Sequence, residues 1–178
     1  RVQRPAIRRE SSEVTKQWIK PIVLTVTGGR DYTDAGVITD ALSARIEHWA
    51  TRYSNKRVFV VIGGAKTGVD EIARQFCMKA GVAHAVIPAE WNNEEFGKSA
   101  GVRRNQQMLD WFTPEEILVY PGGKGTADML ERARELRVMQ VAAKCPPVPV
   151  AVLRVGEDGM ISEDAPRKAD FSDVEDLI

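Results

Sequence analysis

The feature that most constrains this chain is a repeated unit in which a short apolar run ends at glycine and a helix-like pattern follows. The runs IVLTVT (residues 22–27), RVFVVI (57–62) and EILVY (116–120) each stop at a glycine-rich stretch. Continuous apolar runs are typical of parallel strands covered on both faces, because a strand with one face in solvent alternates polar and apolar residues. The sequence therefore predicts an α/β fold with helices on both faces of a parallel sheet.

The remaining segments fit this alternation. Further strands are expected over residues 82–87 and 137–142, and helices over residues 34–52, 69–81, 101–112 and 126–136. Asp34 and Thr126 are the expected N-caps, and Gly81 is expected to end the second helix. Residues 150–161 predict a hairpin around Glu157–Gly159. The predicted fold class is a Rossmann-like, doubly wound, mostly parallel sheet of about five strands with a C-terminal hairpin.

Length and charge bound how the chain is organised. The 178 residues fit one domain with short tails: a basic N-terminal extension (1–20), a Rossmann-like domain (21–144), and a segment with the hairpin and an acidic tail (145–178). The formal net charge is zero, so no broad basic field for nucleic acid is expected. The basic and acidic ends either pair, within one chain or between chains, or form two solvated tails.

Metal and membrane sites are not expected. The two cysteines (Cys77, Cys145) and two histidines (His48, His84) do not have the spacing of a zinc site. No apolar run reaches the ~20 residues of a membrane-spanning helix, and no signal-peptide pattern opens the chain. We expect a chain without a membrane partner in the reducing cytoplasm.

The glycine-rich stretches mark the expected site. Right-handed crossovers place the strand-to-helix loops at one edge of the sheet, where ligands bind in open α/β folds. In Pro121–Thr126 (PGGKGT), three glycines are expected to take positive φ and let a ligand approach the backbone. The helix that follows directs free N–H groups at the same place, and Lys124 adds a cation. This stretch predicts a phosphate site; the alternative is a helix-entry turn that uses glycine only for its geometry.

Other loops add polar groups to the same edge. Arg30 is expected to meet phosphate and Asp31 a ribose hydroxyl, unless both are ordinary surface residues. Arg104 at the start of the third helix suits an anionic ligand. Trp91 either stacks a base or anchors its loop on the core. The full set of expected ligand-binding residues is Thr27, Gly28, Gly29, Arg30, Asp31, Gly63, Gly64, Lys66, Thr67, Gly68, Asp70, Trp91, Arg104, Asn105, Pro121, Gly122, Gly123, Lys124, Gly125 and Thr126.

Five motifs in this order resemble the SLOG superfamily, which joins the DNA-processing protein DprA/Smf to the LOG phosphoribohydrolases. They are T-x-T-G-G-R-D-Y, V-I-G-G-A-K-T-G-V-D, P-A-E-W-N, A-G-V-R-R-N-Q-Q-M and P-G-G-K-G-T-A-D-M. The resemblance covers residues 22–142 and points to the branch related to YspA and YpsA, which is common in bacteria and phages. It implies a Rossmann-like fold that takes a nucleotide or nucleotide-derived ligand at these loops.

The resemblance also bears on catalysis. LOG enzymes hydrolyse the N-glycosidic bond of a nucleoside 5′-monophosphate, and their signature pairs R-x-x-x-M with P-G-G-x-G-T-x-x-E. Arg104 and Met108 match the first element, and Pro121–Thr126 match most of the second. The final glutamate falls on Met129, and Asp128 lies one position earlier. The candidate catalytic residues are therefore Arg104 and Asp128, and one residue of shift on a helix turns a side chain by ~100°.

Two classes of function follow. The first is a module that senses or sequesters a nucleotide-derived ligand, such as an ADP-ribose, NAD-like or cyclic-nucleotide species. The second is an enzyme of LOG type that cleaves the N-glycosidic bond of a nucleoside monophosphate. Single-stranded DNA binding is a more distant third, because zero net charge and the lack of clustered aromatic residues do not favour it. A homo-oligomer is also expected, with the third helix or the hairpin at its interface.

Overall fold

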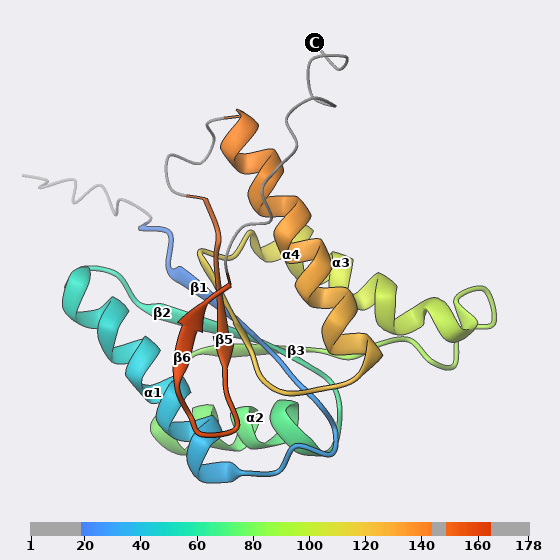
Figure 1. The fold of residues 1–178 in the computed structure, drawn as a ribbon, viewed down its shortest axis with the longest axis horizontal. Helices are drawn as coiled ribbons and strands as arrows, with labels where there is room; N and C mark the ends of the chain where they lie inside the picture. The colour runs from blue at the N-terminus through green and yellow to red at the C-terminus, as the bar shows by residue number, and fades with distance from the viewer. Residues whose placement is uncertain (1–18, 144–148, 165–178) are drawn as a thin grey trace, which may run out of the picture.

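The computed structural model describes residues 19–143 and 149–164, which form one six-stranded sheet between two layers of helices (Figure 1). The strand order is β3-β2-β1-β4-β5-β6. Neighbouring strands run parallel except for β5 and β6, which are antiparallel. The strands are β1 (Ile22–Thr27), β2 (Val58–Gly63), β3 (His84–Ile87), β4 (Glu116–Val119), β5 (Ala151–Val155) and β6 (Ile161–Glu163). The predicted Rossmann-like α/β class is confirmed.

The helices lie in pairs on the two faces of this sheet. They are α1 (Ala35–Arg52), α2 (Gly68–Ala80), the short 3₁₀ turn η1 (Gly97–Ser99), α3 (Ala100–Phe112) and α4 (Lys124–Ala143). Alternate residues of β1 face opposite layers: Leu24 packs in the core with α1 and α2, and Val23 packs in the core with α3 and α4. The apolar runs seen in the sequence are therefore continuous because both faces of each central strand are covered.

Local signals set several boundaries where the sequence places them. Asp34 caps α1, its Oδ1 accepting the N–H of Val37 at 3.0 Å. Gly81 ends α2 in the left-handed conformation, with φ of 67°. The expected hairpin is also present, but its first strand, β5, pairs with β4 in parallel and extends the main sheet.

The expectations for residues 126–142 are wrong in two respects. No strand forms over residues 137–142, because α4 continues to Ala143. No glycine or proline lies between Leu136 and Ala143, and the strong helix formers in that stretch outweigh its two valines. Thr126 is not the N-cap, since α4 begins two residues earlier and Ala127 donates to the Gly123 carbonyl at 3.0 Å.

The strand order places a switch point between β1 and β4. From β1 the chain adds β2 and β3 on one side, and β4, β5 and β6 lie on the other. The chain therefore continues from β1 to α1 on one face and from β4 to α4 on the other, and ligands bind at such a switch point in doubly wound sheets. No helix within residues 19–143 and 149–164 is long and apolar enough to cross a bilayer. Most of the basic head and acidic tail, and Cys145, lie outside the described residues.

Candidate functional site

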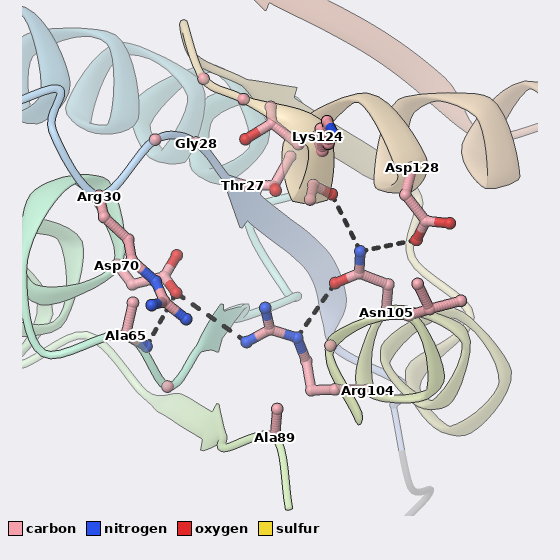
Figure 2. A pocket seen from close by; sticks show the side chains of 18 of the residues that line it. Thr27, Gly28, Arg30, Ala65, Asp70, Ala89, Arg104, Asn105, Lys124 and Asp128 are labelled. Atoms are coloured by element: carbon pink, nitrogen blue, oxygen red, sulfur yellow. Dashed lines mark hydrogen bonds and ion pairs between the residues drawn. The ribbon is translucent and has the colours of Figure 1, made fainter. Parts of the chain in front are cut away.

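A cavity of about 740 Å³ opens at this switch point (Figure 2). Its size is within the range of small-molecule sites. Most of the residues expected from the sequence line it, and they come from the loops after β1, β2, β3 and β4 and from the starts of α3 and α4. The expected residues in its wall are Thr27, Gly28, Gly29, Arg30, Asp31, Gly64, Asp70, Trp91, Arg104, Asn105, Pro121, Gly122, Gly123, Lys124, Gly125, Thr126 and Asp128.

The loops after β1 and β4 lie backbone to backbone. Gly29 N–H donates to the Pro121 carbonyl at 2.8 Å, which extends the strand pairing past the strand ends. A Cβ on Gly122 would lie 2.6 Å from the Gly29 nitrogen. Glycine is required here by close approach rather than by backbone angle. The expectation of positive φ in the PGGKGT loop is wrong, since Gly122, Gly123 and Gly125 all have ordinary φ values.

The N-terminal turn of α4 forms one wall of the cavity. Because the helix begins at Lys124, the amides of its first turn have no carbonyl partner within the helix. The positive end of the helix dipole therefore lies at the cavity. Gly123, Lys124 and Gly125 are part of the cavity wall. Thr126, which the sequence placed at the cap, is 8% exposed inside this first turn. This wall is suited to an anion.

Arg104 is fixed at the base of the cavity. Its Nε donates to the Asn105 side-chain oxygen at 3.0 Å and its Nη1 donates to the Ile87 carbonyl at 3.3 Å. Nη1 also lies 4.0 Å from Asp70 Oδ2. Among the described residues no acceptor contacts Nη2, and the guanidinium lies between Asp70 and Asn105 (Figure 2). Burial lowers the pKa of Arg104, against the attraction of Asp70.

Asp70, in the first turn of α2, directs its carboxylate into the glycine loop after β2. It accepts the Ala65 N–H at 3.1 Å and is 6% exposed. Burial raises its pKa, although the Ala65 amide and Arg104 act to lower it. Gly63 lies beneath both charged groups, where an added Cβ would lie 3.0 Å from Cζ of Arg104. The glycine loop after β2 therefore donates its Ala65 N–H to a carboxylate of this chain.

Four expected ligand-binding residues in and beside the glycine loop after β2 are not in the cavity wall: Gly63, Lys66, Thr67 and Gly68. Gly68 has another role. It takes φ of 66°, and its neighbour Val69 donates to the Gly29 carbonyl at 3.2 Å. The start of α2 therefore holds the loop after β1 in place, and Gly68 is needed there because it takes a positive φ.

Asn105 connects Arg104 to α4. The side chain is 3% exposed, and its Nδ2 donates to the Gly125 carbonyl at 3.0 Å and to Asp128 Oδ2 at 2.9 Å. Asp128 also accepts from Arg132 at 3.0 Å and lies in the cavity wall (Figure 2). Met129 is fully buried in the core between α3, α4 and the sheet. The carboxylate that the cavity holds on this helix is therefore Asp128.

Six wall residues were not among those expected to bind a ligand, although all of them except Lys98 lie within the five motifs. Gly101 lies under the ring of Trp91, and Lys98 adds a second cation from η1. The remaining unexpected wall residues are Tyr32, Ala65, Ala89 and Val102. Position within a motif was the signal that could have found the other five, whereas Lys98 lies outside the motifs, two residues before α3.

Part of the chain matches a known protein family. Residues 22–93 match the model of the YspA, cpYpsA-related SLOG family. The match includes β1, β2 and β3, the loops after β1 and β2, and part of the loop after β3, and so covers one side of the cavity. No curated protein matches the chain. The resemblance inferred from the motifs is confirmed over these residues.

Proposed function

From the match of residues 22–93 to the YspA, cpYpsA-related SLOG family, we propose that the chain binds a nucleotide-derived ligand in this cavity. The phosphate group lies between the N-terminal turn of α4 and Arg104. An ADP-ribose or NAD-like species fits the family, and the role is sensing or sequestration. The binding site is formed by the residues of the wall described above.

Arg104 is the observation that carries this proposal. The Arg104 side chain is 18% exposed, and a cation that is mostly removed from water is stabilised by a compensating charge. Asp70, at 4.0 Å, is too distant for a full hydrogen-bonded pair. The side chain is nevertheless held in place by Ile87 and Asn105, with Nη2 available. A phosphate group in the cavity would accept a hydrogen bond from Nη2 of Arg104. Its oxygens would also accept hydrogen bonds from the free N–H groups of the first turn of α4.

The test compares Arg104→Ala with Arg103→Ala by isothermal titration of AMP and ADP-ribose. Arg103 is the matched control, because it is exposed and stacks on Phe96 at 4.3 Å. Loss of a charge-assisted hydrogen bond is expected to weaken binding about 10- to 100-fold in Arg104→Ala. Arg103→Ala should bind as the unchanged protein does. Equal affinity in both variants would refute the phosphate site.

Asp128 supports a second candidate, a hydrolase of the N-glycosidic bond. The residue at the position of the LOG glutamate is in the core, but Asp128 brings a carboxylate to the cavity from the same helix. Its Oδ2 accepts hydrogen bonds from Asn105 and Arg132, which fix the carboxylate in the cavity wall. Such a carboxylate can stabilise an oxocarbenium-like transition state.

Release of free base from AMP, followed by chromatography, distinguishes the two candidates. If the chain is a hydrolase, Asp128→Asn should lower the rate by about 10²- to 10⁴-fold. Asp110→Asn is the matched control, since Asp110 is exposed on α3 and is not in the cavity wall. Binding of AMP with no base release by the unchanged protein would leave the binding module as the function.

A further inference from the structure

Trp91 is a large aromatic residue in the cavity wall that the core does not cover. Its side chain is 53% exposed, so it does not serve mainly to anchor its loop. Tryptophan is usually well buried when its role is packing, because its ring carries a large apolar area. An exposed ring in a cavity wall offers that area to a ligand.

The ring is held in position before any ligand binds. An added Cβ on Gly101 would lie 3.1 Å from Cη2 of Trp91, so the absence of a side chain there admits the ring against α3. The loop is also closed by backbone hydrogen bonds, from Trp91 to Ala89 at 3.0 Å and from Asn93 to Glu90 at 3.1 Å. A ring fixed in this way loses little conformational freedom on binding.

Arg30 connects this ring to the phosphate end of the cavity. Its guanidinium carbon lies 5.7 Å from the centre of the Trp91 ring, within the range of a cation–π contact. Arg30 follows Gly29, whose amide is bonded to the Pro121 carbonyl beside α4. A flat cation and a flat ring therefore lie together next to the proposed phosphate position, and both can stack on a planar heterocycle.

The cavity has two chemically different ends. Ala89, whose carbonyl accepts the Trp91 N–H at 3.0 Å, is in the wall, and so are Lys124 and the first turn of α4. Figure 2 shows Ala89 on the side of the cavity away from Lys124. We infer that the planar base of a nucleotide stacks on Trp91 beside Arg30, while its phosphate meets α4. This inference rests on the proposed nucleotide function and assigns the base to one residue.

The test measures affinity for AMP and for ribose 5-phosphate, which has the phosphate but no base. Isothermal titration is performed with the unchanged protein, Trp91→Ala, Trp91→Phe and Trp111→Ala. Trp111 is the matched control, because it is 67% exposed and is not in the cavity wall. Trp91→Ala is expected to weaken AMP binding roughly 10- to 100-fold and to leave ribose 5-phosphate unchanged. Trp91→Phe should keep most of the AMP affinity.

Three outcomes would overturn the inference, and they can be told apart. Unchanged AMP affinity in Trp91→Ala would mean that the base does not stack there. An equal loss for AMP and ribose 5-phosphate would mean that Trp91 only holds its loop. Binding of neither compound by the unchanged protein would refute the proposed function itself, and the base site with it.

Discussion

At the scale of single residues, two adjacent glycines of the PGGKGT loop have different roles. A Cβ on Gly122 would meet Thr126 and the Gly29 backbone, whereas a Cβ on Gly123 would have no heavy atom within 4 Å. Gly122→Ala is therefore expected to lower the free energy of unfolding by about 1–3 kcal/mol, as overpacked sites do. Gly123→Ala should change it by less than about 1 kcal/mol. Urea unfolding of both variants measures the difference, and equal stabilities would contradict the close approach.

Asp70 gives the site a dependence on pH. Its raised pKa means that the folded chain holds a proton there at a pH where the unfolded chain has lost it. Stability is therefore expected to fall as pH rises from the ordinary to the raised pKa. Protonation also removes a negative charge beside Arg104, so anion affinity should rise as pH falls through the raised pKa.

Asp70→Asn isolates this effect, because it resembles the protonated form at every pH. At pH 8 the variant is expected to bind AMP about 3- to 10-fold more tightly than the unchanged protein. The ratio should approach one as pH falls, since titration of AMP itself affects both proteins equally. A ratio that stays constant with pH would show that Asp70 does not titrate beside the ligand.

At the scale of elements, Asn105 ties α3 to the first turns of α4. Asn105→Ala leaves the Gly125 carbonyl and Asp128 without their donor, which should cost about 1–3 kcal/mol of unfolding free energy. Arg104 also loses the acceptor of its Nε, so AMP affinity should fall with stability. Urea unfolding and titration measure both. Gln107→Ala on the same helix is the control, and a similar loss there would argue against a specific link.

At the scale of the whole molecule, a buried ion pair that stabilises the fold and the proposed ligand cavity lie at opposite ends of the sheet. Glu116 begins β4, away from the cavity, and is 1% exposed. Arg45 donates to it at 2.7 and 2.6 Å, and Trp49 donates at 3.0 Å. Arg45→Ala is expected to lower the free energy of unfolding by about 3–5 kcal/mol, because a buried charge loses its partner. AMP affinity of the folded variant should not change; Arg52→Ala, exposed on the same helix, is the control.

The expected homo-oligomer remains a prediction at this scale. Val152 and Val155 of β5 pack in the core, so what the hairpin offers a second copy is its edge strand β6 and Met160, which is 69% exposed. On α3 the exposed apolar residue that a second copy could contact is Trp111. Light scattering should give at least twice the mass of one chain. A single-chain mass at high micromolar concentration would contradict the prediction.

The sequence by itself determined the class of fold and the edge that carries the site. Uninterrupted apolar runs can be buried only in a sheet covered on both faces, and glycines after β1 and β4 mark where its loops turn. Asp34 and Gly81 fixed two helix boundaries because capping acts over three or four residues. The PGGKGT loop and Arg104 were identified from residue type and order alone.

Only the tertiary structure decided which side chains meet. Whether Asp128 or Met129 faces the cavity depends on where α4 begins, and capping patterns did not show that start. The glycine loop after β2 was expected to bind the ligand, but the Ala65 N–H in that loop donates to Asp70 instead. Trp91 became a cavity residue because Gly101, ten positions away, leaves room for its ring. These outcomes depend on how separate elements pack against one another, and no local pattern encodes the angle at which they do so.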